Sequence, residues 1–420
     1  MYSPRRNPRS FQFGKGNKKM TEEQQQPVEE QPVEEQPVEE LDIQIPDLEI
    51  PDIDLEDYEI PEDEETAIED ESGGSQTFAW IGSGQGGGRI AKAFYDRGYK
   101  KCIAVNTSSH DLDTLDLPSQ QKFLLNVGEQ GAGKNMEKGR DAANKYKQTI
   151  FDLMRKTYGN NVDHVFVCVG AGGGSGSGSV LTLIETAKKY MEYIGHDDAE
   201  KRVGVIMSLP TRGEATSPQV SSNAYEVLKT VGELAEGGSI SPLLIIDNSK
   251  IEKMYRGLTV KQFWPTVNNT ISGLFHVFNV LTSNASPYTS FDPTDYSSVL
   301  RCGGVLVMGV AKLKEFEDEQ KVSNAIKSNI EKTLLSEVEL SNSKVAACVA
   351  VGSKDIMENT PGLMDSLSYG FDTLASLCPS AVLHRGIYED NKDSLRLYTI
   401  VSGLGVPLKR LQQLSKGEKL

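Results

Sequence analysis

The sequence has no run of about 18 apolar residues, so it predicts no transmembrane helix. Its N-terminus lacks the apolar stretch of a secretory signal peptide. Only five cysteines occur in 420 residues, an odd number with no C-x-x-C pair, and the five histidines show no metal-ligand spacing. We therefore expect a cytoplasmic protein with reduced, mostly buried thiols and no direct membrane insertion, and we do not expect a zinc enzyme.

Basic residues are absent from one long stretch of the chain. Residues 21–77 contain 23 acidic residues and no lysine or arginine, whereas residues 1–20 contain six basic residues and no acid. The remaining 343 residues carry 38 basic and 37 acidic side chains. The net charge of −16 therefore belongs to the N-terminal segment, and the near-neutral body argues against a broad basic surface for nucleic acid.

Residues 1–76 also have few large apolar side chains, a repeated Gln-Pro-Val-Glu-Glu and eight of the 18 prolines, a composition typical of disordered chain. We predict a disordered tail over this range. Residues 41–61 differ, because isoleucine, leucine and acidic residues alternate around prolines. This segment is either more solvated tail or an extended peptide that docks on a partner or on the protein's own body.

From residue 77 onward, short apolar runs alternate with amphipathic segments, which predicts an α/β fold with a parallel sheet. The apolar runs, which we predict to be strands, are residues 78–84, 102–106, 165–170, 202–210 and 242–247. A long helix is predicted near residues 257–283. Its apolar side chains recur at helical spacing and should face the core: Phe263, Val267, Ile271, Phe275, Phe278 and Leu281.

A second unit of strands and helices follows the long helix. Its predicted strands are residues 303–313, 344–352, 380–388 and 395–403, and its predicted helices are residues 318–337 and 362–377. The predicted organisation has five parts: a tail (1–76), a Rossmann-like domain with a parallel sheet (77–255), a long central helix (256–284), a C-terminal α/β domain (285–408) and a short basic tail (409–420).

The first of three glycine-rich loops lies between a predicted strand and a predicted helix. Gly82, Gly84 and Gly87 satisfy G-x-G-x-x-G, the fingerprint of a dinucleotide site in which phosphates sit at a helix N-terminus. A dehydrogenase would place an acid at the end of the next strand to bind ribose, but Asn106 stands there. The loop therefore indicates phosphate binding more than a nicotinamide cofactor.

The second loop, residues 128–135, nearly matches the G-x-x-x-x-G-K-[ST] phosphate loop, but Asn135 takes the place of the magnesium-binding hydroxyl. The sequence shows no clear strand and helix around it, so we interpret it as a chance near-match. The third loop, residues 170–178, has six glycines in nine residues directly after an apolar run. Such a backbone can wrap an anion closely, and we favour a phosphate cradle over a flexible surface loop.

This third loop, Gly-Ala-Gly-Gly-Gly-Ser-Gly-Ser-Gly, resembles the tubulin/FtsZ signature G-[GA]-G-G-G-[ST]-G-[ST]-G. Further segments resemble the family's other loops in the family's order, and the resemblance spans about residues 77–405. It implies a GTPase domain and a C-terminal domain joined by a central helix, with GTP or GDP as ligand and Mg²⁺ as cofactor. The implied nucleotide-binding residues are Gly82, Gly84, Gln85, Gly86, Gly87, Asn106, Gly131, Ala132, Gly133, Asn135, Gly170, Gly172, Gly173, Gly174, Ser175, Gly176, Glu214, Asn248, Trp264 and Asn268.

Residues 291–295, Phe-Asp-Pro-Thr-Asp, resemble the family's synergy loop N-x-D-x-x-D. In the family these acids come from the next subunit and polarise the attacking water. The resemblance therefore implies that Asp292 and Asp295 are catalytic and that the protein forms a head-to-tail filament with itself. From local sequence alone, the two aspartates instead predict a turn and a helix cap around Pro293.

The chain ends without the long linker and apolar peptide of cell-division members of the family, which favours a phage- or plasmid-type relative. We expect such a filament to position or segregate viral or plasmid DNA, through an adaptor or DNA-binding partner held by a terminal tail. The alternative is a nucleotide-binding homologue that caps or decorates filaments without hydrolysis. A NAD(P)-dependent enzyme is a third interpretation.

Overall fold

The computed structural model describes residues 68–128, 131–255, 259–314, 316, 319–331, 333 and 338–416. The segment at 41–61 and most of the predicted N-terminal tail lie outside the described residues. In the described part of the chain, no helix has the length and apolarity needed to cross a membrane. All five cysteines are unpaired thiols, and four of them are buried.

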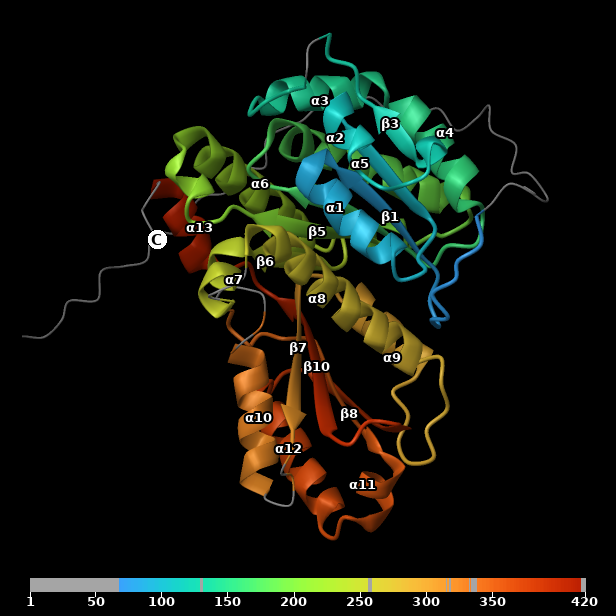
Figure 1. Ribbon diagram of the computed structural model, residues 1–420, viewed down its shortest axis with the longest axis vertical. Coiled ribbons are helices and arrows are strands. Elements are labelled where there is room, and N and C mark those ends of the chain that lie inside the picture. The colour runs from blue at the N-terminus through green and yellow to red at the C-terminus, as the bar shows by residue number, and fades with distance from the viewer. Residues whose placement is uncertain are drawn as a thin grey trace, which may run out of the picture. The chain divides into compact units, whose positions relative to one another are not determined.

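The described strands form one ten-stranded sheet (Figure 1). They are β1 (Phe78–Ser83), β2 (Cys102–Asn106), β3 (Lys122–Leu124), β4 (His164–Gly170), β5 (Val203–Leu209), β6 (Leu243–Asp247), β7 (Val305–Leu313), β8 (Val345–Ser353), β9 (Val382–Asp390) and β10 (Leu395–Leu404). Their order across the sheet is β3-β2-β1-β4-β5-β6-β7-β10-β8-β9. The predicted α/β fold with a mostly parallel sheet is therefore confirmed.

The two predicted units share this sheet. Strands β1 to β6 pair in parallel, and β6 meets β7 through a single parallel pair, Leu243 with Val305. Beyond it, β10 runs antiparallel to both β7 and β8, and β9 runs parallel to β8 at the sheet edge. The pairing of β6 with β7 thus joins the strands of the two predicted units into one sheet.

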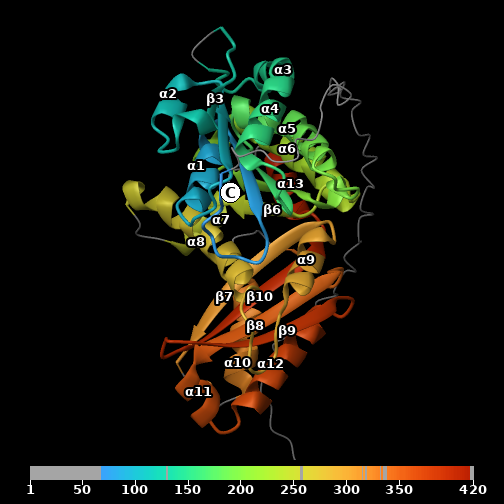
Figure 2. The same ribbon diagram turned by 90° about the vertical axis from the view of Figure 1, so that its right-hand side faces the viewer.

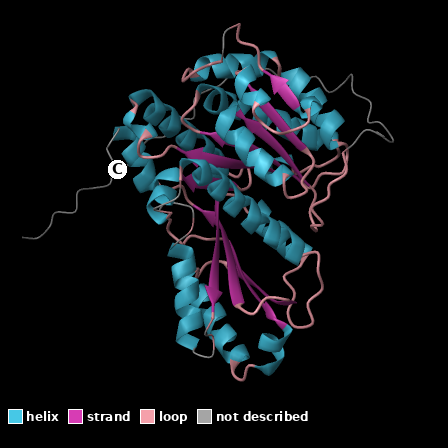
Figure 3. Cartoon of the chain, viewed as in Figure 1, coloured by secondary structure: helices cyan, strands magenta, loops and turns pink. Residues whose placement is uncertain are grey.

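The helices cover both faces of the sheet (Figure 3). They are α1 (Gly84–Tyr95), α2 (Ser109–Asp113), α3 (Met136–Lys145), α4 (Lys147–Tyr158), α5 (Gly174–Tyr193), α6 (Pro218–Glu236), α7 (Asn248–Met254), α8 (Val260–Leu281), α9 (Pro293–Arg301), α10 (Glu319–Glu331), α11 (Lys354–Asn359), α12 (Leu363–Leu377) and α13 (Leu408–Lys416). In Figure 2, α10 and α12 lie together against the strands β7 to β10.

Strand periodicity divides most of the core into two large clusters, one on each face of the sheet, and a small third cluster lies around Leu112 and Leu117. Along β1, Ala79 and Ile81 belong to one cluster, whereas Phe78 and Trp80 belong to the other. Successive side chains of a strand point to opposite faces, so a strand that is buried on both faces is apolar throughout. This is why the uninterrupted apolar run at the start of the body forms a central strand.

Helix α8 packs on the second of these clusters. The apolar side chains predicted to face the core do so: Val267, Ile271, Phe275 and Phe278 are buried, and Phe263 and Leu281 are partly buried. Phe275 meets Trp80 edge-to-face at 5.4 Å between ring centroids, and Trp80 stacks on Phe94 of α1 at 3.5 Å. This aromatic contact holds α8 beside α1 and the first strand.

Residues 70–76, within the range predicted as tail, contact the body. The Glu71 amide donates to the Gly98 carbonyl at 2.8 Å. The Gln76 amide donates to Asn279 Oδ1 at 2.9 Å, and Asn279 Nδ2 donates to the Gln76 carbonyl at 3.1 Å. Contacts with α8 and with the turn that follows α1 therefore begin at least six residues before the predicted domain boundary.

Most of the predicted basic tail is also part of the packed body. Residues 408–416 form α13, which packs on α6, and Arg410 and Leu414 are each 2 % exposed. Leucines at every third position, 408, 411 and 414, separated by polar and basic residues, thus form an amphipathic helix here. The last four residues, 417–420, lie outside the described residues.

Candidate nucleotide-binding site

A pocket of about 280 Å³ lies at the carboxyl ends of β1, β4, β5 and β6, beside the first half of α8. Parallel strands bring the loops that follow them to one edge of a sheet, which is where ligands of α/β proteins bind. Fifteen of the predicted nucleotide-binding residues line this pocket: Gly84, Gln85, Gly86, Asn106, Gly133, Gly170, Gly172, Gly173, Gly174, Ser175, Gly176, Glu214, Asn248, Trp264 and Asn268.

In the first glycine loop, two of the predicted ligand residues serve packing instead. A Cβ on Gly87 would stand 1.9 Å from the Cys168 carbonyl oxygen, and a Cβ on Gly82 would stand 2.4 Å from the Gly87 carbonyl oxygen. Neither glycine lines the pocket. They let α1 approach β1 and β4, while Gly84, with φ +69°, turns the chain into the helix at the pocket wall.

The third loop supplies the opposite wall of the pocket. Strand β4 ends at Gly170, Gly173 is the N-cap of α5, and the helix begins at Gly174. The N-termini of α1 and α5 thus reach the same pocket. The first-turn N–H groups of a helix have no partner within the helix, and its N-terminus is the positive end of the helix dipole, so two such termini together favour an anion.

Hydrogen bonds between loops hold this arrangement. Thr107 Oγ1 lies 2.6 Å from Ser175 Oγ and accepts from the Ala132 amide at 2.8 Å. The Gly174 amide donates to the Gly133 carbonyl at 3.0 Å. Three loops that are distant in the sequence are therefore joined around the pocket.

The structure corrects our interpretation that residues 128–135 resemble a phosphate loop only by chance. The short strand β3 precedes it and α3 follows it, so a strand and a helix do frame the loop. Gly133 and Lys134 line the pocket, whereas Gly131 and Ala132 do not. Asn135 also lies outside the pocket wall, because its side chain caps α3 by accepting from the Lys138 amide at 3.0 Å.

Charged side chains that our motif search did not select as ligands complete the wall. Arg89 and Lys134 bring positive charge to the pocket, and Asp111 brings a carboxylate. Gln85 Nε2 donates to Asp111 Oδ1 at 3.3 Å, and Asn106 Nδ2 donates to Asp111 Oδ2 at 3.2 Å. The sequence pattern that could have identified Asp111 is the S-x-x-D capping motif at the start of α2. In the structure, Ser108 Oγ accepts from the Asp111 amide.

The far end of the pocket is formed by side chains from the start of α7 and from α8. Trp264 and Asn268 lie four residues apart on α8 and therefore share one helix face. Asn248 is 3 % exposed, and its Oδ1 has no hydrogen-bond partner within the described residues. A buried acceptor without a donor costs about 1–3 kcal/mol, so this atom is placed to accept a hydrogen bond from a ligand in the pocket.

Glu214 lies at the rim of the pocket. It begins a short 3-10 helix, Glu214–Thr216, after β5. Its Oε2 accepts from the Thr211 amide at 2.9 Å, and its own amide donates to Thr211 Oγ1 at 3.2 Å. These reciprocal bonds hold the exposed carboxylate in place beside the pocket.

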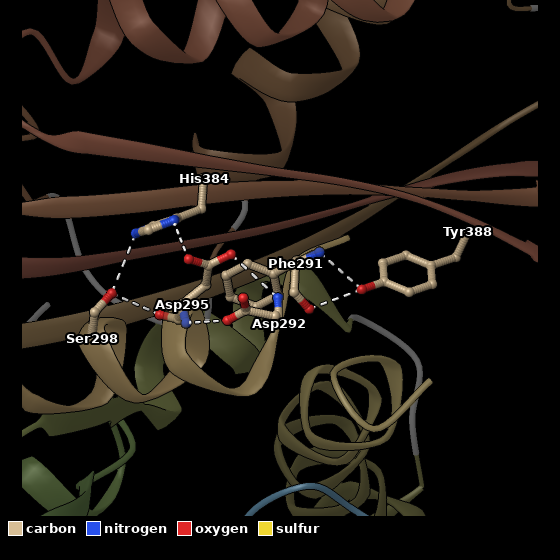
Figure 4. Close-up of polar contacts among 6 residues, drawn as sticks. All are labelled: Phe291, Asp292, Asp295, Ser298, His384 and Tyr388. Atoms are coloured by element: carbon tan, nitrogen blue, oxygen red, sulfur yellow. Dashed lines mark hydrogen bonds and ion pairs between the residues drawn. The ribbon is translucent and has the colours of Figure 1, made fainter. Parts of the chain in front are cut away.

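Asp292 and Asp295 do not line the pocket. They cap the start of α9, whose Tyr296 packs against Phe275 and Phe278 in the C-terminal half of α8. The pocket instead lies beside the first half of α8, which contributes Trp264 and Asn268. The local prediction of a helix cap is confirmed, because each aspartate accepts from the other's amide (Figure 4).

The comparisons with known proteins agree with this geometry. Residues 77–256 match the model described as Tubulin/FtsZ family, GTPase domain. This part of the chain is therefore similar to the GTPase domain of tubulin/FtsZ proteins. The chain is also 24 % identical over 386 residues to the tubulin-like protein TubZ of Bacillus cereus, covering 83 % of each chain.

Solved structures of tubulin/FtsZ proteins share the fold. The chain resembles the GTPγS-form protofilament of TubZ from Bacillus thuringiensis serovar israelensis with a TM-score of 0.70, at 20 % identity over 82 % of this chain and 91 % of that one. A structure described as type III plasmid segregation TubZ matches with a TM-score of 0.67, at 20 % identity and the same coverage.

Proposed function

We propose that this protein binds GTP in the pocket, assembles head-to-tail into a filament and hydrolyses GTP at the contact between subunits. The observation that carries the proposal is that Asp292 and Asp295 cap α9 beside the C-terminal half of α8, whereas the pocket lies beside the first half of α8 and neither aspartate lines it. A single chain cannot bring these acids to its own pocket. A second copy stacked head-to-tail can, and such a contact does not close on itself, so it produces a filament.

The pocket's wall suits a nucleoside triphosphate. The N-termini of α1 and α5, with Arg89 and Lys134, would hold the phosphates. Trp264 would stack on the base, and the unpartnered Asn248 Oδ1 would accept from one of the N–H groups of guanine. Glu214 at the rim would accept from a ribose hydroxyl. These roles divide the residues into a phosphate end and a base end.

The donor set also suits Mg²⁺. Asp111 is a carboxylate in the pocket wall, held by Gln85 and Asn106, and magnesium in such sites takes one or two carboxylates beside phosphate oxygens and waters. The ion would neutralise charge on the phosphates. The protein's own part is to position the phosphates between two helix N-termini and to exclude other anions.

The cargo proposal depends on the relatives. TubZ is described as a plasmid segregation protein and forms protofilaments in its solved structures. We propose that this chain likewise moves plasmid or viral DNA. Since the body beyond residue 77 is close to neutral, DNA would be reached through an adaptor or DNA-binding partner bound to a terminal segment.

The test is light scattering and phosphate release after addition of GTP and Mg²⁺. Wild type should assemble and release phosphate, and Asp292→Ala should assemble but release phosphate at least about 100-fold more slowly. A pocket-filling variant, Gly173→Leu, should do neither by itself. An equal mixture of the two variants should regain part of the hydrolysis, because the Gly173→Leu subunits offer Asp292 to intact pockets.

Two results would contradict the proposal. Wild type that shows neither assembly nor phosphate release over a range of concentrations would reduce the protein to a nucleotide-binding relative. Assembly with GTP but no phosphate release would favour the homologue that caps or decorates filaments.

A further inference from the structure

A short segment directly before β1, residues 70–76, crosses the C-terminal end of α8, and we call it the strap. The Ser75 amide donates to the Asn279 carbonyl at 3.1 Å, and Ser75 Oγ lies 2.7 Å from Thr282 Oγ1. These bonds add to the pairing of Gln76 with the Asn279 side chain. The strap therefore ties the last turn of α8 to the start of the first strand.

Asn279 is the centre of this contact. Its side chain is fully buried, its Oδ1 accepts from the Gln76 amide at 2.9 Å, and its Nδ2 donates to the Gln76 carbonyl at 3.1 Å. The second N–H of Nδ2 faces the Tyr99 hydroxyl at 3.2 Å. Gly74 leaves room for this amide, since a Cβ there would stand 1.9 Å from Asn279 Nδ2. One side chain of α8 thus pairs with both backbone groups of a strap residue.

A second polar contact holds α8 nearer the pocket. Arg97, in the turn after α1, donates from Nε to Ser272 Oγ at 2.7 Å and from Nη2 to the Asn269 carbonyl at 2.8 Å. Asn268, the preceding residue, lines the pocket. Directional hydrogen bonds therefore fix α8 at two levels, one beside the pocket and one at its C-terminal end.

The strap holds the end of α8 that leads to Asp292 and Asp295. Phe278, the residue before Asn279, stacks with Tyr296 of α9 at 6.3 Å between ring centroids. The two aspartates cap the N-terminus of α9. The position of α8 at Asn279 therefore sets the position of α9 and its aspartates relative to β1 and the pocket behind it.

We propose that Asn279 is a positioning residue for hydrolysis. By binding the strap it fixes the C-terminal half of α8, and with it Asp292 and Asp295, against the domain that holds the pocket. The inference rests on the proposed hydrolysis at the subunit contact. Asn279 itself does not line the pocket. A displacement of about 1 Å at a reacting group can cost roughly 100-fold in rate, so loosening the strap should slow hydrolysis and leave nucleotide binding unchanged.

The experiment measures phosphate release per assembled subunit, the KM for GTP, and the Kd for GDP of the unassembled full-length chain. Asn279→Ala removes the bonds to the strap and keeps a good helix former in α8. It should lower kcat about tenfold, with KM and Kd within about twofold of wild type. Asn284→Ala is the matched control and should behave as wild type. Asn284 is exposed at the same end of α8, and its Nδ2 donates to the Val280 carbonyl at 3.1 Å.

A reversible crosslink provides the rescue. Ser75→Cys and Thr282→Cys, added to Asn279→Ala, place two thiols where two hydroxyl oxygens lie 2.7 Å apart, close to the roughly 2.05 Å of a disulfide. The oxidised protein should regain a kcat within about twofold of wild type, and dithiothreitol should return it to the rate of Asn279→Ala. Asn279→Ala without the two cysteines is the control for oxidation.

Three results would overturn the inference alone: a wild-type kcat in Asn279→Ala, a loss of GDP affinity as large as the loss of kcat, or a crosslinked protein that stays slow. If Asn279→Ala fails to fold, Gly74→Ala decides in its place, because its Cβ displaces the strap and leaves Asn279 intact. It should show the same loss of kcat. A wild-type chain that neither assembles nor hydrolyses would instead overturn the proposed function and this inference with it.

Discussion

Arg410 of the C-terminal helix α13 lies 3.3 Å from Asp247 at the end of β6, measured from Nε to Oδ2. Arg410 Nη2 also donates to the Pro210 carbonyl at 3.2 Å. Pro210 and Asn248, the residue after Asp247, both line the nucleotide pocket. Burial raises the pKa of the Asp247 carboxyl and lowers that of the Arg410 guanidinium, and each partner's charge opposes the shift of the other. Helix α13, some 160 residues after β6 in the chain, thus holds two segments that line the pocket.

Arg410→Met should weaken both the fold and the pocket. It leaves the Asp247 carboxylate buried without its partner, which typically costs about 3–5 kcal/mol in the free energy of unfolding. Because Arg410 would no longer hold the segments around Pro210 and Asp247, the affinity for nucleotide should also fall. Urea unfolding and titration with a fluorescent GTP analogue measure the two effects. Gln412→Ala, on the exposed face of α13, is the matched control, and a variant equal to it in both assays would contradict the prediction.

Gly87 and Gly173 should respond to alanine in opposite ways. The Cβ of Gly87→Ala would stand 1.9 Å from the Cys168 carbonyl oxygen, so α1 must move and stability should fall by at least about 1–3 kcal/mol. At Gly173 no heavy atom lies within 4 Å of an added Cβ, so the fold should be unchanged. Because Gly173 lines the pocket, its methyl should still lower GTP affinity by about tenfold, or 1.4 kcal/mol.

Thermal unfolding and nucleotide titration of both variants check these expectations. A stable Gly87→Ala variant that binds nucleotide less tightly would assign this glycine to the ligand rather than to packing. Gly173→Ala with wild-type affinity would remove the third loop from the phosphate site.

Tryptophan fluorescence should report nucleotide binding through one residue. The chain has two tryptophans. Trp80 is fully buried between Phe94 and Phe166, whereas Trp264 lines the pocket. We expect GDP to quench the emission because the base stacks on Trp264. Trp264→Phe should retain the emission of Trp80 and lose the quenching. Equal quenching in wild type and Trp264→Phe would place the nucleotide elsewhere.

His164 should make the fold sensitive to acid. Burial of its ring lowers the pKa from 6.5 to about 3. Between these values the unfolded chain binds a proton that the folded chain does not, so the free energy of unfolding falls with decreasing pH, by up to about 1.4 kcal/mol per pH unit. The full stability is present above pH 6.5 and is lost progressively as the pH falls toward 3.

His164→Phe keeps an aromatic ring beside Phe166, whose centroid lies 4.8 Å from that of His164. Urea unfolding at pH 6.5 and pH 5 should show that wild type loses about 2 kcal/mol more than this variant over the interval. Equal losses in the two proteins would mean that His164 is protonated in the folded state.

Local patterns predicted most elements of the fold. The run Phe-Ala-Trp-Ile is buried on both faces as β1, and the apolar stripe of α8 faces the core as expected. Helices α3 and α4 were not predicted, and neither were two shorter elements. Strand β3 is only Lys122–Leu124, and α2 is five residues long. Their conformation depends on pairing with β2 and on packing against α1, which a short window of sequence does not contain.

The sequence by itself determined the α/β class, the glycine-rich loops and their resemblance to the tubulin/FtsZ family, because strand alternation, helical spacing and glycine content are properties of neighbouring residues. Only the tertiary structure decided which glycines face the pocket and which serve packing, that Arg410 holds the pocket loops, and that Asp292 and Asp295 lie outside the pocket, beside the C-terminal half of α8. Those facts are distances between residues far apart in the chain, and they are set by the packing of helices on a shared sheet.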